Sequence, residues 1–200
     1  MKQMKIKLKS LVLIAFITFS NFGYAQVNYE MQVSNEIAIN LMGTSTLHDW
    51  EMEANLASGE AQFIFKSGSG SELASLKSLW FALKVKDLKS DNEGLNKNAY
   101  KALNSDKYQN IRYTLISNTL TRKKEGYLFQ SYGKLTIAGV TRDIKMDVHS
   151  IINPDGTVTC KGSYKLNMTD YNVEPPSFMF GAMTTGDALT LNFEVIYKKS

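Results

Sequence analysis

The chain has 200 residues, enough for one domain of ordinary size. Its formal net charge of +4 comes from the N-terminal leader: removing the four lysines of residues 1–25 from the 23 basic residues leaves 19, equal to the 19 acidic residues. The basic composition is therefore no evidence for a nucleic-acid partner or an acidic lipid surface, and we expect no nucleic-acid partner.

Residues 1–25 have the three-part pattern of a secretory signal peptide. Four lysines precede the apolar run Leu11–Phe19, and Gly23 and Ala25 supply small residues at the −3 and −1 positions of a cleavage site before Gln26. A run of nine residues is shorter than the roughly 20 that a spanning helix needs. We expect a cleaved leader over residues 1–25, a secreted domain over residues 26–200, and no membrane span in the mature chain.

From Gln26 onward, apolar and polar residues alternate with the period of two that β-strands have. The stretch Gly43–Glu51 (GTSTLHDWE) predicts a corner between two early strands, with Trp50 as the first large anchor of the interior. The alternation predicts strands over Tyr29–Val33, Glu36–Met42, Trp50–Phe65, Leu79–Leu88, Ile111–Ser117, Tyr127–Ile137, Thr141–Ile151, Thr157–Met168 and Leu189–Tyr197.

One helix is predicted near Leu95–Leu103, capped by Asp91 or Asn92. Its apolar residues fall on one narrow stripe, and so short a helix is not stable alone in water. We expect it to dock across an open end of the sheet. The segment Asp170–Thr185, which contains two prolines, is expected to form a long loop.

Eight or nine strands joined mostly by hairpins indicate an all-β fold that must protect its edges by closing or by forming a sandwich. Several predicted strands have ten or more residues, longer than usual. We therefore favour a closed antiparallel β-barrel of about eight strands, lipocalin-like, with one short helix. A barrel of this size has room for side chains or one slender ligand.

No pattern for catalysis, phosphate binding or zinc binding is present, so we expect no catalytic residues, no metal and no cofactor. The chain has only two histidines, His48 and His149, which we expect to be hydrogen-bonded structural residues. An enzyme of unrecognised type that uses them with Asp49 stays open as an alternative. The single cysteine, Cys160, excludes an intramolecular disulfide and falls on the inward phase of its strand.

The aromatic residues carry more information, because they occupy the apolar phase of long strands. Either they form an ordinary packed core, or they surround an apolar tunnel for a lipid-like chain. In a tunnel, each buried CH₂ contributes about 0.8 kcal/mol, so a long hydrocarbon needs no charged anchor. The lining predicted for such a tunnel consists of Trp50, Phe81, Leu83, Phe129, Leu135, Tyr164 and Phe193.

Four stretches follow one another in a fixed order along the chain: Gly43-Thr44-Ser45 with Leu47-His48-Asp49-Trp50, Leu95–Ile111, Gly133–Thr141, and Met168-Thr169-Asp170-Tyr171 before Pro175-Pro176. In this order they resemble the YceI-like family of secreted lipid-binding barrels, over about Tyr29 to Lys198. Where that family often has a proline, this chain has Gln109-Asn110 before Ile111.

The resemblance implies a lipocalin-like barrel that holds a polyisoprenoid chain in the periplasm of a Gram-negative cell. We therefore expect a periplasmic protein that carries or sequesters a long apolar lipid, such as a polyisoprenoid or an isoprenoid quinone. The Leu95–Leu103 helix or the Asp170–Thr185 loop would be its lid. The alternative is a structural or stress-linked barrel with a filled core that acts through a protein partner. A homodimer is left open.

Overall fold

The computed structural model describes residues 24–31, 38–67, 72–178 and 182–200, which form eleven strands, one α-helix and two short 3-10 helices. The predicted leader therefore lies almost wholly outside the described residues. The strands are β1 (Tyr24–Met31), β2 (Ala38–Ser45), β3 (Trp50–Ala54), β4 (Ser58–Lys66), β5 (Leu73–Lys84), β6 (Asn110–Arg122), β7 (Tyr127–Ile137), β8 (Val140–Ile152), β9 (Val158–Asn167), β10 (Ser177–Phe178) and β11 (Met183–Lys199). The helices are η1 (Val85–Asp87), α1 (Glu93–Ala102) and η2 (Thr169–Tyr171).

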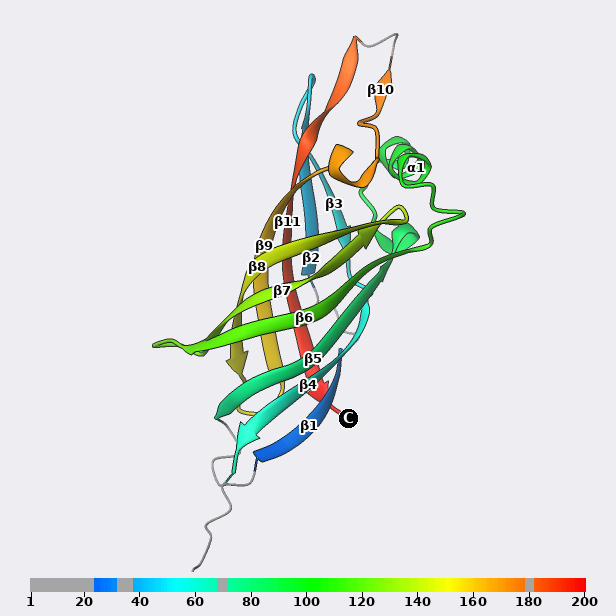
Figure 1. Cartoon of the computed structure of the whole chain (residues 1–200). Coiled ribbons are helices and arrows are strands. Elements are labelled where there is room, and N and C mark those ends of the chain that lie inside the picture. The colour runs from blue at the N-terminus through cyan, green and yellow to red at the C-terminus, as the bar shows by residue number, and fades with distance from the viewer. Residues whose placement is uncertain (1–23, 32–37, 68–71, 179–181) are drawn as a thin grey trace, which may run out of the picture.

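Eight strands form a closed ring in the order β1-β4-β5-β6-β7-β8-β9-β11, and every neighbouring pair is antiparallel. The ring closes where Tyr29–Met31 of β1 pairs with Tyr197–Lys199 of β11. The strands cross the molecule at a tilt, as Figure 1 shows. The prediction of an all-β, closed antiparallel barrel is confirmed.

The ring departs from a regular barrel at β11. The end of β11 pairs with β1, whereas its earlier residues on the same edge pair with β2, which in turn pairs with β3. Glu53 of β3 then exchanges two backbone hydrogen bonds with Lys89, with N···O distances of 2.6 and 2.8 Å. This bridge joins the β2–β3 hairpin to the segment after β5, so the wall continues around the upper half in Figure 1.

Several predicted strands differ from the structure. The strands β6 and β11 extend beyond the predicted Ile111–Ser117 and Leu189–Tyr197, and two other predictions differ in division or bounds. The stretch Trp50–Phe65 is two strands, because β3 pairs with β2 whereas β4 pairs with β1 and β5. The alternation of apolar residues continues across residues 55–57 and hides this change of partner. The strand expected over Leu79–Leu88 begins at Leu73 and ends at Lys84, where the chain turns into η1. Tyr127–Ile137 is a strand with the predicted bounds.

The helix α1 lies at the upper end of the ring (Figure 1), where Ala102 packs against the core cluster that contains Tyr171 of η2. Asn92 caps it, because its Oδ1 accepts hydrogen bonds from the backbone N–H groups of Gly94 (2.9 Å) and Leu95 (3.2 Å). The predicted helix and one of its two predicted caps are confirmed. The expected loop Asp170–Thr185 instead contains the end of η2, the strand β10 and the start of β11, with residues 179–181 outside the described part.

The lower end of the ring is filled by aromatic side chains that meet edge to face or tilted. The Phe63 ring lies 5.2 Å from that of Tyr29, 6.1 Å from that of Tyr197 and 6.4 Å from that of Phe129, centroid to centroid. All four side chains are buried. Aromatic pairs in these arrangements stabilise a core by more than the burial of their surface area accounts for. Because the four rings fill the lower end of the ring of strands, they close that end.

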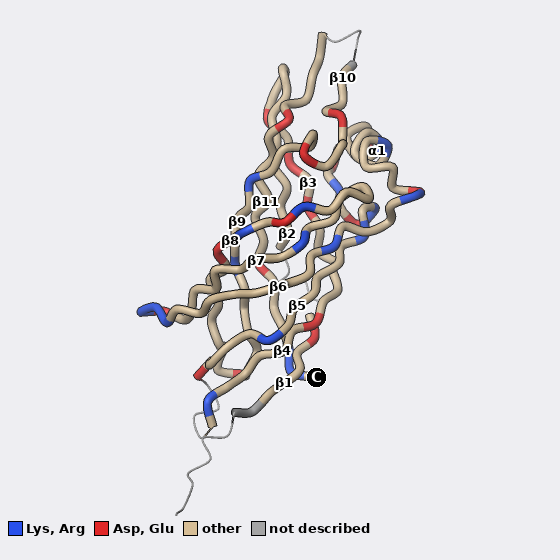
Figure 2. The backbone as a smooth tube through the Cα atoms, in the orientation of Figure 1, with Lys and Arg blue, Asp and Glu red and all other residues tan. Residues whose placement is uncertain are grey.

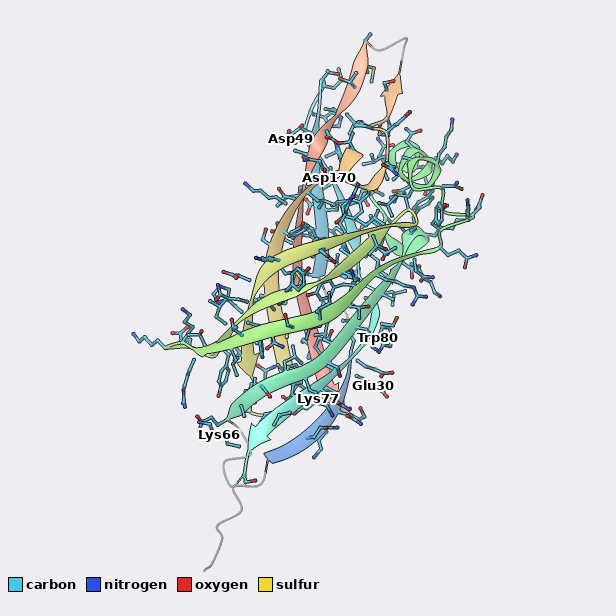
Figure 3. All side chains as sticks on the ribbon, in the orientation of Figure 1. Glu30, Asp49, Lys66, Lys77, Trp80 and Asp170 are labelled. Atoms are coloured by element: carbon cyan, nitrogen blue, oxygen red, sulfur yellow. The ribbon has the colours of Figure 1, made fainter. Side chains whose placement is uncertain are left out.

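Charged residues lie on the outside of the sheet and at its ends. Figure 2 shows acidic and basic positions interspersed along the strands, with a basic cluster, Arg122–Lys124, at the tip of the β6–β7 hairpin. Figure 3 shows the labelled side chains of Glu30, Lys77 and Trp80 on the outer surface. None of the helices in the described part of the chain has the length and apolar character to span a membrane.

A cavity inside the ring of strands

An apolar cavity of about 230 Å³ lies inside the ring, between the aromatic lower end and helix α1. An engineered cavity of about 150 Å³ in another protein is large enough to bind benzene, so this one has room for a larger apolar group. Aliphatic and aromatic side chains from nearly every strand line it, and no charged residue of the described part of the chain does. An interior of this kind excludes water and favours hydrocarbon.

All seven residues predicted to line a tunnel contact this cavity. Each lies on the inward phase of its strand, which alternation alone determines; their role in binding a ligand stays a prediction. They come from five strands: Trp50 from β3, Phe81 and Leu83 from β5, Phe129 and Leu135 from β7, Tyr164 from β9, and Phe193 from β11.

The floor of the cavity belongs to the aromatic cluster. Phe63, Phe129 and Tyr197 contact both the cavity above and the filled core below. Phe63 and Tyr197 have relative exposures of 0% and 1%. A guest in the cavity therefore meets a closed, apolar end and has to enter from the end that α1 covers.

The mouth is covered by two segments that the sequence named as candidate lids. Leu95, Ala99 and Leu103 of the helix stripe line the cavity, and from the other segment Tyr171 and Thr185 line it as well. Residues of both segments therefore line the cavity, and the role of either segment as a lid stays a prediction.

Asn96 hydrogen-bonds α1 to Ser90, in the segment that precedes the helix. Its Nδ2 donates to the Ser90 carbonyl oxygen (3.0 Å), and its Oδ1 accepts from the Ser90 backbone N–H (2.7 Å). Asn96 has a relative exposure of 4%, so these bonds are shielded from water. The alternation and stripe patterns of the sequence did not single out this residue, because it lies beside the apolar stripe and is polar.

Glycines let three aromatic rings lie against the inner wall. A Cβ added at Gly43 would lie 2.2 Å from Cζ2 of Trp50, and one at Gly162 would lie 2.5 Å from Cζ of Phe193. A Cβ at Gly133 would lie 2.5 Å from both Cζ and the hydroxyl oxygen of Tyr113.

Each of these rings therefore occupies the space of a missing side chain and not the centre of the cavity. Trp50 is fixed further by its indole N–H, which donates to the Thr44 carbonyl oxygen at 3.0 Å. The predicted corner between two strands is thus built on the contact between Gly43 and Trp50, which are paired across β2 and β3.

Few polar groups reach the cavity, and most belong to tyrosines. Burial raises the pKa of Tyr113 to about 12, and the neighbouring Ser131 hydroxyl opposes that shift. Burial also raises the pKa of Tyr164 and of Tyr171, and the nearby Asp170 carboxylate adds to both shifts. These hydroxyls stay protonated at neutral pH and can donate hydrogen bonds.

The residues of the alternative catalytic hypothesis lie outside the cavity. His48 is exposed in the turn between β2 and β3, where its Nδ1 lies 2.7 Å from the Asp49 carbonyl oxygen. His149 is exposed on β8. The described residues hold no group of three or more His, Cys, Asp or Glu side chains that could bind a metal ion.

Cys160 faces the cavity, as predicted, and is buried. Burial raises the pKa of its thiol to about 11, although the Ser150 hydroxyl, which donates to Sγ at 3.2 Å, lowers it in part. A thiol in this state is a poor nucleophile and acts as a small apolar residue.

Comparison with known proteins agrees with this architecture. A model of the family described as "YceI-like domain" matches residues 43–197. The chain belongs to the YceI-like domain family. The matched region of this YceI-like protein begins at the glycine under Trp50 and ends at the tyrosine in the floor of the cavity. No curated protein matches the chain.

Solved structures share the fold at low sequence identity. Burkholderia cenocepacia BcnA matches with a TM-score of 0.63 and 15% identity over 82% of this chain and 99% of that chain. A polyisoprenoid binding domain from Saccharophagus degradans, implicated in plant cell wall breakdown, matches with a TM-score of 0.64 and 10% identity over 87% and 99%. The Campylobacter jejuni YCEI protein matches with a TM-score of 0.52 and 17% identity over 100% and 93%.

Proposed function

We propose that this YceI-like protein is a periplasmic protein that carries or sequesters one long apolar lipid, such as a polyisoprenoid or an isoprenoid quinone. The observation that carries the proposal is the uncharged cavity with an aromatic floor and a helical cover. The Saccharophagus degradans neighbour, a polyisoprenoid binding domain, supports the same class of ligand. Family membership favours binding over catalysis.

The energetics of the cavity favour a chain-like guest. About ten methylenes transferred from water into an apolar interior contribute roughly 8 kcal/mol before the cost of immobilising the guest. A lining without charged groups gives no preference for a charged head group and imposes no desolvation penalty on a hydrocarbon. A flexible isoprenoid tail fits these conditions better than a compact polar metabolite.

The cover supports a role in carrying or sequestering. Helix α1 is short and is held by the hydrogen bonds of Asn96 and Tyr100, whose hydroxyl donates to the carbonyl oxygens of Lys86 (3.1 Å) and Leu88 (3.0 Å). A cover held by a few polar contacts opens at lower free energy than the ring of strands. Opening of α1 would let a lipid enter and leave while the walls stay intact.

The periplasmic setting rests on the predicted leader, whose cleavage before Gln26 would leave most of β1 in the ring. Cell fractionation with N-terminal sequencing tests it. A mature chain that begins at Gln26 in the periplasmic fraction supports the proposal, and an uncleaved chain in the membrane or cytoplasm contradicts it.

The test of ligand binding uses the full chain expressed with its leader in a Gram-negative cell and purified without detergent. Native mass spectrometry is expected to show one apolar molecule per chain, which organic extraction releases. Ala99→Trp, which places an indole in the mouth, is expected to abolish this mass increment. Lys97→Trp, on the exposed face of the same helix, is the matched control.

Wild-type protein that carries no apolar molecule and takes up none from vesicles would contradict the proposal. That result would favour the alternative, a structural or stress-linked barrel that acts through a protein partner. Loss of the ligand from both tryptophan variants would show that α1 had been disrupted, and cavity occupancy would then be tested with Leu191→Trp on β11, in the cavity wall.

A further inference from the structure

The hydroxyl group of Tyr113 is buried and has no acceptor for its proton. Tyr113 has a relative exposure of 5%, and among the described residues its hydroxyl oxygen is the one buried side-chain nitrogen or oxygen without a partner in hydrogen-bonding geometry. The Ser131 hydroxyl beside it lowers the pKa of Tyr113, which is the effect of a neighbour that donates to the phenol oxygen and not of one that accepts its proton. A buried polar group in this state destabilises the fold, and native proteins keep few of them. Its position at the cavity therefore calls for a functional explanation.

The side chain is aimed along the inner wall. Tyr113 lies on β6 opposite Leu135 of β7, yet its ring lies over Gly133, two residues away along β7. The next inward residue on that strand is Ser131, which has a relative exposure of 6% and also lines the cavity. The Tyr113 hydroxyl thus points from the α1 end toward the floor and lies beside a second hydroxyl.

The surroundings limit what this donor can bind. Among the described residues, the cavity lining contains no lysine, arginine or histidine to neutralise an anion. A phosphate or diphosphate placed there would be a desolvated charge without a counter-ion, which is strongly unfavourable. A neutral oxygen that accepts one hydrogen bond satisfies Tyr113 without that penalty.

We propose that Tyr113 recognises a neutral oxygen of the bound lipid, with its hydroxyl donating a hydrogen bond to a carbonyl, ether or hydroxyl oxygen held beside Ser131. This inference rests on the proposed lipid-binding function and specifies its ligand. The ligand is an oxygenated neutral lipid whose oxygen lies inside the cavity, and a diphosphate head group would have to stay outside. Gly133 serves the site by leaving room for the tyrosine ring.

Tyr127 provides a matched control on the neighbouring strand. It is buried to the same degree, with 6% exposure, but its hydroxyl accepts a hydrogen bond from the Leu73 backbone N–H at 3.1 Å. Tyr127→Phe removes a satisfied group and leaves the Leu73 N–H unpaired, so it should lower the melting temperature. Tyr113→Phe removes an unsatisfied group and should leave the melting temperature of the ligand-free protein unchanged or higher.

The binding experiment uses three probes with the same C20 isoprenoid tail: a methyl ketone, the hydrocarbon, and the diphosphate. Each is titrated into delipidated full-length wild type, Tyr113→Phe and Tyr127→Phe. Wild type is expected to bind the ketone more tightly than the hydrocarbon and far more tightly than the diphosphate. Tyr113→Phe is expected to weaken ketone binding roughly 3- to 10-fold, the usual effect of one hydrogen bond, and to change hydrocarbon binding less than about 2-fold.

The outcomes separate this inference from the proposed function. If the ketone and the hydrocarbon bind wild type and Tyr113→Phe equally well, the tyrosine donor is overturned while lipid binding stands. Diphosphate binding as tight as that of the ketone would overturn the requirement for a neutral head group inside the cavity. If no probe binds wild type, the proposed function itself fails.

Discussion

Phe193 and Gly162 face each other across β11 and β9, and the phenyl ring covers the glycine. The two residues are register partners, and a Cβ at position 162 would lie 2.5 Å from Cζ and 2.9 Å from Cε1 of the ring. The ring therefore lies along the inner wall. The cavity beside it exists in part because residue 162 has no side chain.

Gly162→Ala is expected to reduce ligand binding and stability together. The new methyl group would push the Phe193 ring toward the cavity, and overpacking of this kind costs roughly 1–3 kcal/mol. Chemical denaturation and lipid titration measure the two effects. Ser163→Ala, at the exposed neighbouring position, is the control, and a Gly162→Ala protein with unaltered lipid affinity would contradict a role for this contact in shaping the cavity.

Asn96→Ala is expected to loosen the cover and speed ligand exchange. The change leaves the Ser90 N–H and carbonyl groups without their partner, which costs about 1–3 kcal/mol. We expect this loss to destabilise α1 more than the ring of strands. Hydrogen exchange should rise in α1 and stay low in β6 to β8, while the dissociation rate of a bound lipid increases. Lys97→Ala on the exposed face should leave both unchanged; an equal effect of the two variants would contradict this account.

Alkaline pH is expected to destabilise the protein, because two groups that are buried in the folded state lose their protons more easily in the unfolded state. Burial raises the pKa of Tyr113 from 10.0 to about 12 and that of Cys160 from 9.0 to about 11. Between about pH 9 and pH 12 the folded state therefore holds more protons than the unfolded state. The free energy of unfolding has its full value below about pH 9 and falls as the pH rises toward 12.

Tyr113→Phe removes one of these protons and should make that fall less steep, by up to about 1.4 kcal/mol per pH unit between pH 10 and 12. Urea denaturation at a series of alkaline pH values measures the slope. A slope equal to that of wild type would show that Tyr113 ionises as easily in the folded as in the unfolded protein.

Cys160 is expected to resist alkylation until the protein unfolds. Its side chain is 4% exposed, and its raised pKa leaves little thiolate at pH 8. Labelling by iodoacetamide should be slower in the native state than in urea by more than about 100-fold, because reaction requires opening of the ring. Ser163→Cys, on the outer face of the same strand, should add one thiol that reacts at once, and rapid labelling of native wild type would refute the buried position.

The direction of the side chains was predictable from local patterns. Residues two apart on a strand face the same side, so alternation placed Phe129, Leu135 and Phe193 inside before any strand partner was known. The cap at Asn92 and the apolar stripe of α1 were equally local. The sequence also predicted a closed antiparallel sheet, because about nine long strands would otherwise leave unprotected edges.

The partners of each strand, the cavity and the unpaired hydroxyl required the tertiary structure. Alternation does not change where a strand exchanges its neighbours, so the break after Ala54 was hidden. Nor does it give the distance between walls, since Tyr113 and Gly133 belong to different strands and their contact depends on register. Which residues face inward is set by each strand alone, but the space left between them is set by all the strands at once.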